Sequence, residues 1–112
     1  MVTKRTLIAI ATDGNGRLWS GHFGIAPLYL IYSPQGDLVE ERQNPYGAGQ
    51  GKAHQHHDDP RLIINLLSEC AVFIGRRMGE ESKRKLAQKF GIDAVLIDRK
   101  TPEEALRAYL EG

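Results

Sequence analysis

The sequence predicts an α/β domain in which helices cover both faces of a five-stranded mixed sheet. Two observations lead to this fold class. Three strand-like segments come first, and helix-like and strand-like segments then alternate to the end of the chain. The length of 112 residues corresponds to one domain with one layered core, so residues 1–112 are taken as a single domain.

The first half of the chain contains three predicted strands. Residues 6–12 form a continuous apolar and β-branched run, which is typical of a central strand that is covered on both faces. Residues 28–32 form a second such run, and the turn at residues 33–37 leads into a third strand at residues 38–42. The charged residues of this third strand predict a place at the edge of the sheet, where charge opposes further pairing.

The second half of the chain is predicted to contain three helices and two strands. Asp59 and Pro60 have the residue types of a helix N-cap and first turn, Gly91 is typical of a helix end, and residues 101–104 read as a capping box. The expected elements are a helix from residue 60 to Cys70, a strand at residues 71–75, a helix at residues 80–90, a strand at residues 92–98 and a last helix after residue 101.

Connectivity rules place these strands in a definite order. A hairpin joins the first strands, and right-handed crossovers add the later ones in parallel. The predicted order is 3-2-1-4-5, counted along the chain, with the second strand antiparallel to the rest. Residue 22 and the loop at residues 44–59 then lie at the same edge of the sheet as the end of the strand at residues 71–75. Ligands of open α/β sheets bind at this carboxyl edge.

Composition excludes several classes of function. A formal net charge of +1 gives no strong field for nucleic acid or membranes. The sequence contains no apolar run long enough to span a membrane and no signal peptide, so a cytoplasmic protein is expected. The single cysteine excludes an internal disulfide and any site with four cysteines from one chain.

Histidines are the candidate metal ligands. Neutral imidazole binds iron, zinc, copper or nickel, and all four histidines are predicted to lie at the carboxyl edge: His22, His54, His56 and His57. Arg76 and Arg77 follow the fourth strand at this edge and suit an anionic ligand. Cys70 is predicted at the opposite edge, on an apolar helix face, so a small buried hydrophobic residue is favoured over a ligand.

These residues leave three functions open. The first is a binding module in which the histidine-rich loop wraps a metal or closes over a cluster. The second is a hydrolase in which a single histidine-bound divalent metal activates water, with Asp13 as a candidate base. The third is a protein-interaction domain whose histidine-rich loop is incidental. A homodimer through the edge strand at residues 38–42 also stays open.

Several motifs together resemble a known family. These are the segment Ser20-Gly-His22-Phe23-Gly24, the segment from Gly75 to Gly79 after a strand, and Phe90-Gly91-Ile92. They are similar to the dinitrogenase iron–molybdenum cofactor biosynthesis family, which includes NifX-like carriers and the C-terminal domain of NifB-type proteins. The resemblance covers nearly the whole chain.

The resemblance implies a ribonuclease H-like fold and a non-catalytic role. Family members bind iron–molybdenum cofactor or an iron–sulfur precursor and pass it from a donor protein to an acceptor protein. The expected cluster-binding residues are His22, Phe23, Gly24 and Gly79 of these motifs, together with Arg76 and Arg77, which suit an anionic cluster. His54, His56 and His57 are expected as further metal ligands.

Overall fold

The computed structural model of the chain describes residues 6–45 and 60–112. Its five strands form one sheet of order β3-β2-β1-β4-β5, which confirms the predicted order. β1 pairs antiparallel with β2 and parallel with β4, so β2 runs against its neighbours as predicted. The strands are β1 (Leu7–Thr12), β2 (Leu28–Tyr32), β3 (Leu38–Gln43), β4 (Cys70–Gly75) and β5 (Asp93–Leu96).

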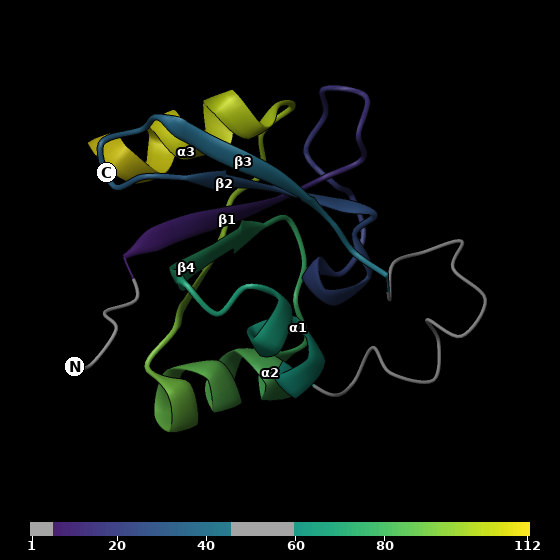
Figure 1. Cartoon of the computed structure of the whole chain (residues 1–112), viewed down its shortest axis with the longest axis vertical. Helices are drawn as coiled ribbons and strands as arrows, with labels where there is room; N and C mark the ends of the chain where they lie inside the picture. Colours follow the sequence, from purple (N-terminus) through teal and green to yellow (C-terminus); the bar gives the residue numbers. More distant parts are fainter. Residues whose placement is uncertain (1–5, 46–59) are drawn as a thin grey trace.

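Helices cover both faces of this sheet, as predicted (Figure 1). α1 and α2 lie on one side, and α3 lies on the other. A short 3₁₀ helix, η1, lies within the β1–β2 connection, and a π-helical turn, η3, follows α2. Their bounds are η1 (Phe23–Ile25), α1 (Pro60–Leu66), α2 (Glu80–Lys85), η3 (Leu86–Phe90) and α3 (Pro102–Glu111).

The alternation of side chains along the strands produces two cores. Ala9, Ala11 and Phe73 point to the face that α1 and η3 cover. Ile8 and Ile10 point to the opposite face, against α3. Both faces of β1 are therefore buried, which explains its continuous apolar sequence.

Two helix predictions are wrong in extent. The helix predicted from residue 60 to Cys70 ends at Leu66, and Cys70 is the first residue of β4. The helix predicted over residues 80–90 is α-helical only to Lys85 and continues as η3. Gly91 ends η3 with a left-handed φ of 67°, in agreement with its predicted role as a stop.

The last helix begins as predicted. The Thr101 side chain accepts a hydrogen bond of 3.1 Å from the backbone N–H of Glu104, and Pro102 occupies the first turn. β5 spans Asp93–Leu96, which is shorter than the predicted residues 92–98. Among the described residues, no helix has the length and the apolar character needed to cross a bilayer.

Candidate functional site

The loop between β1 and β2 meets the segment that follows β4, as the topology predicts. His22 and Arg77 form an isolated parallel bridge, and the backbone N–H of Phe23 donates to the Arg77 carbonyl at 2.8 Å. The His22 side chain is exposed. The bridge therefore presents His22 to solvent at the carboxyl edge of the sheet, next to a basic segment.

Phe23 anchors this loop in the core. Its side chain is 2% exposed, and its ring stacks on Phe73 with centroids 4.8 Å apart. A Cβ atom added at Gly75 would lie 3.1 Å from Phe23 Cδ1, so the glycine at the end of β4 leaves room for the ring. The hydroxyl of Tyr29 donates to the Phe23 carbonyl at 2.6 Å. Phe23 thus fixes the backbone beside His22, while its own ring faces the interior.

Trp19 and Gly21 set the conformation just before His22. The indole N–H of Trp19 donates to the His22 carbonyl at 3.0 Å. A Cβ atom added at Gly21 would lie 2.9 Å from Trp19 Nε1, which is closer than real Cβ contacts. Glycine at this position therefore allows the indole to fold over the loop and hold the His22 backbone.

Asn44 is a buried polar residue that sequence reasoning missed. It is 2% exposed, and its amide nitrogen donates to the carbonyls of Gly24 and Ala26 at 3.1 and 2.8 Å. The same nitrogen lies 3.1 Å from the Tyr29 hydroxyl, and burial raises the Tyr29 pKa. Its partners are 15–20 positions earlier in the chain, so no local pattern identifies it.

Asn44 also ties the end of β3 to the His22 loop. Residues 46–59 begin two positions later and contain His54, His56 and His57. These three histidines lie outside the described residues. Asn44 itself, at the end of β3, lies beside Gly24.

The two consecutive arginines have different surroundings. Arg77 takes part in the bridge with His22. Arg76 forms an ion pair of 2.6 Å with Asp98 and lines a surface cavity together with Trp19 and Ser20. Gly79, the third predicted residue of this segment, is the N-cap of α2.

Cys70 lies at the other edge of the sheet. It is fully buried and paired with Leu7 at the start of β1, whereas His22 follows the end of β1. Burial raises the pKa of the Cys70 thiol to about 12, so the thiolate form, which ligates metals, is disfavoured. Within residues 6–45 and 60–112, no three His, Cys, Asp or Glu residues are grouped to hold a metal ion.

Residues 4–112 match the model of the family described as dinitrogenase iron–molybdenum cofactor. The chain belongs to this family. The resemblance seen in the His22 loop and in the segment after β4 is therefore confirmed over almost the entire length.

A solved structure supports the fold. The chain is similar to an NMR structure from Thermotoga, described as a candidate NifB protein of the DUF35 family, with a TM-score of 0.69 and 21% identity. The match covers 96% of this chain and 89% of the Thermotoga chain. A search of curated proteins gives no significant match. At this identity the likeness concerns the fold.

Proposed function

We propose that the protein is a non-catalytic cytoplasmic carrier of an iron–molybdenum-type or iron–sulfur cluster, or of a precursor of one. The cluster would be cargo, received from a donor protein and released to an acceptor protein. The observation that carries the proposal is the backbone bridge between His22 and Arg77, which brings two exposed residues together at the carboxyl edge of the sheet. Membership in the iron–molybdenum cofactor family supports the same cargo.

The chemistry of the loop fits temporary binding. A neutral imidazole is a good ligand for iron and other borderline metals. A preassembled cluster contains its own sulfides, so it needs few protein ligands, and few ligands also favour release. Arg77, on the segment bonded to the loop, would offset negative charge on the cluster. Phe23 would act by positioning His22, because its ring is buried.

His54, His56 and His57 are proposed as the remaining ligands. Asn44, close before their segment in the sequence, bonds to the carbonyls of Gly24 and Ala26 next to the His22 loop. This anchoring of Asn44 supports a contribution of at least one of the three imidazoles beside His22.

The proposal can be tested by anaerobic loading. The purified protein is incubated with ferrous iron and sulfide or, separately, with isolated iron–molybdenum cofactor, and it is then desalted. Retained metal, retained sulfide and the visible absorption spectrum are measured. We expect both variants, His22→Ala and the triple replacement of His54, His56 and His57 by alanine, to retain less cluster than the unmodified protein.

Lys89→Ala is a suitable control, because Lys89 is exposed on η3, away from the His22 loop. It should load like the unmodified protein. Equal retention by His22→Ala and the unmodified protein would refute the assignment of His22. Retained iron without sulfide would instead indicate a single bound metal ion.

A further inference from the structure

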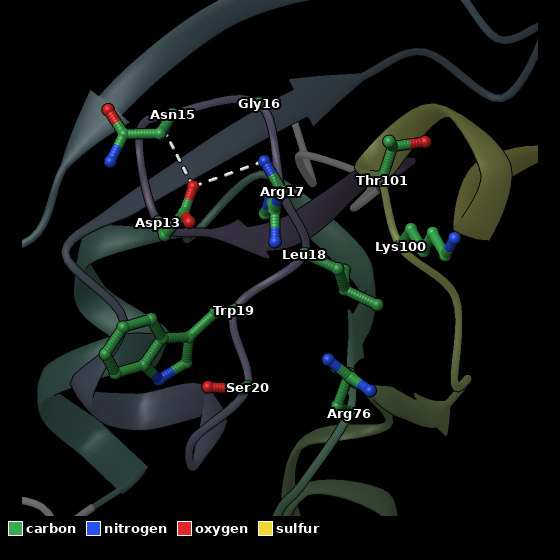
Figure 2. A pocket seen from close by; sticks show the side chains of 10 residues that line it. All are labelled: Asp13, Asn15, Gly16, Arg17, Leu18, Trp19, Ser20, Arg76, Lys100 and Thr101. Atoms are coloured by element: carbon green, nitrogen blue, oxygen red, sulfur yellow. Dashed lines mark hydrogen bonds between the residues drawn. The ribbon is translucent and has the colours of Figure 1, made fainter.

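A cavity of about 610 Å³ opens at the carboxyl edge beside the His22 loop. Figure 2 shows the connection after β1 on one side, Arg76 below it, and the segment before α3 on the other side. The lining therefore comes from three stretches that are distant in the sequence. The lining residues are Asp13, Asn15, Gly16, Arg17, Leu18, Trp19, Ser20, Arg76, Lys100 and Thr101.

Hydrogen bonds hold the first wall of this cavity in place. One Asp13 carboxylate oxygen accepts from the backbone N–H groups of Asn15 and Arg17, at 2.7 and 3.2 Å. The Thr12 hydroxyl donates to the Arg17 carbonyl at 2.7 Å. The position of Arg17 is therefore fixed through its backbone, and its side chain contributes nothing to these bonds.

The opposite wall is joined to the first by one further bond. The backbone N–H of Leu18 donates to the Lys100 carbonyl at 2.9 Å. Leu18 is 2% exposed, so this contact lies against the core. Arg17 and Lys100 are consequently kept on two adjacent walls of one cavity.

The cavity carries an excess of positive charge. Arg17, Arg76 and Lys100 line it with three cationic groups, and Asp13 is the one carboxylate in the lining. Neither the Arg17 guanidinium nor the Lys100 ammonium is ion-paired with a residue in the described part of the chain. Arg76 is already paired with Asp98 at 2.6 Å. Arg17 and Lys100 therefore face the single lining carboxylate, Asp13, which leaves an excess of one positive charge.

We propose that this cavity binds a phosphate group, either as free phosphate or as part of an organic phosphate ester. The cations come from three chain segments, which suits a tetrahedral group whose oxygens point in several directions. A planar carboxylate would match one guanidinium group and would leave the remaining cations of the lining without a partner. At neutral pH a phosphate monoester also carries close to two negative charges, which would attract the unpaired Arg17 and Lys100 side chains.

Neighbouring residues could hold the organic part of an ester. Leu18 and Trp19 contribute apolar surface, and the Ser20 and Thr101 hydroxyls are hydrogen-bonding groups at the cavity wall. The site does not depend on the proposed cluster function, because Arg17 and Lys100 are not part of the His22 bridge.

Tryptophan fluorescence provides a local test. Trp19 is the single tryptophan of the chain and lines the cavity. The protein is titrated with inorganic phosphate and with phenyl phosphate at constant ionic strength, and calorimetry checks the affinity. We expect saturable binding that Arg17→Ala and Lys100→Ala each weaken about fivefold or more, since each loses a charge-assisted contact.

Arg107→Ala is the matched control, because Arg107 is exposed on α3 outside this lining. It should bind both compounds like the unmodified protein. Tighter binding of phenyl phosphate would identify an ester, and equal binding would identify free phosphate. The proposal is overturned if neither compound binds saturably up to millimolar concentration, or if Arg17→Ala and Lys100→Ala bind as tightly as the unmodified protein.

Discussion

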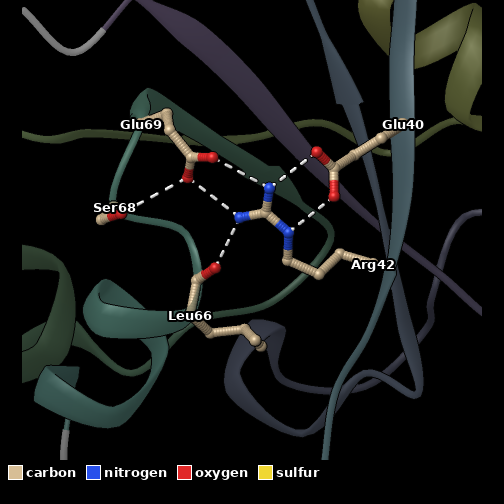
Figure 3. A network of polar contacts seen from close by, with 5 residues as sticks. All are labelled: Glu40, Arg42, Leu66, Ser68 and Glu69. Atoms are coloured by element: carbon tan, nitrogen blue, oxygen red, sulfur yellow. Dashed lines mark hydrogen bonds and ion pairs between the residues drawn. The ribbon is translucent and has the colours of Figure 1, made fainter.

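Arginine has opposite surroundings in two groups of charged residues: Arg42 is fully bonded in one, and Arg17 of the other has no ion-pair partner in the part of the chain that the structure describes. Arg42 of β3 lies in a network with Glu40, Glu69 and the Leu66 carbonyl (Figure 3). The five N–H donors of its guanidinium match contacts of 2.6–3.0 Å to these three partners. In the cavity of Figure 2, by contrast, Arg17 has no ion-pair partner among the described residues.

The difference separates arginines that hold the fold from arginines that are available to a ligand. Arg42 connects β3 to the end of α1, and its side chain is 19% exposed. Its hydrogen bonds to Glu69 raise the pKa of Arg42 and lower the pKa of Glu69 to about 2. The N–H donors of Arg42 all bond to groups of the protein and so cannot bind cargo. The bonds that an arginine makes within the fold therefore indicate its role better than its charge alone.

The strongest test of this comparison replaces one arginine from each group. Arg42→Ala removes every contact of the network and leaves the Leu66 carbonyl without this donor, so we expect the free energy of unfolding to fall by about 1–3 kcal/mol. Arg17→Ala should change it by less than about 0.5 kcal/mol. Urea denaturation followed by circular dichroism measures both. Equal effects of the two replacements would contradict the distinction.

A smaller effect is expected from pH. The pKa of Glu69 is lowered from an ordinary value near 4.5 to about 2, chiefly by hydrogen bonds from Arg42. Its stabilisation should therefore be complete above about pH 4.5 and should disappear as the pH falls toward 2. The Glu69 side chain is 43% exposed, so solvent screening limits the contribution to about 1 kcal/mol or less.

The measurement compares urea denaturation of the unmodified protein and of Glu69→Gln at several pH values. The variant should be less stable near neutral pH, and the difference should shrink through this acid range. Glu111→Gln, at the exposed end of α3, is the control. A difference that stays constant with pH would show that the charge of Glu69 is not responsible.

The order of the sheet was predictable because it depends on local signals. The apolar run of β1 indicated a strand that is buried on both faces, and the charges of β3 indicated an edge strand. The end of α1 was mispredicted because Leu67 and Cys70 continue the apolar spacing of a helix. They are buried in the turn and in β4 instead, on the same core face as α1.

The positions of the site residues were predictable only where the order and direction of the strands determine them. The meeting of His22 with Arg77 follows from strand order and direction. The different surroundings of Arg76 and Arg77 depend on how the chain leaves β4, which no residue pattern specifies. The contacts of Asn44, and those of Arg42 with Leu66 and Glu69, join residues 15–27 positions apart, and such contacts leave no local periodicity. The π-helical turn η3 was also not predictable from the apolar spacing, which fits an α-helix equally well.

Arg76 is intermediate between the two groups and provides the finest test. It is paired with Asp98 at 2.6 Å, but the two side chains are 36% and 84% exposed. Such a pair stabilises the fold by less than about 0.5 kcal/mol, so Asp98→Asn should leave urea denaturation almost unchanged. Removal of this carboxylate should make the phosphate cavity more positive and should free Arg76 to turn toward a ligand.

We therefore expect Asp98→Asn to bind phenyl phosphate about two- to threefold more tightly in the Trp19 fluorescence titration, through reduced charge repulsion near the surface. The gain should diminish at high salt, because screening weakens interactions between exposed charges. Asp93→Asn, an exposed replacement on β5 outside the cavity lining, controls for net charge. Weaker binding by Asp98→Asn would mean that Asp98 orients Arg76 for the ligand, and Arg76 would then resemble the internally bonded Arg42 more than Arg17.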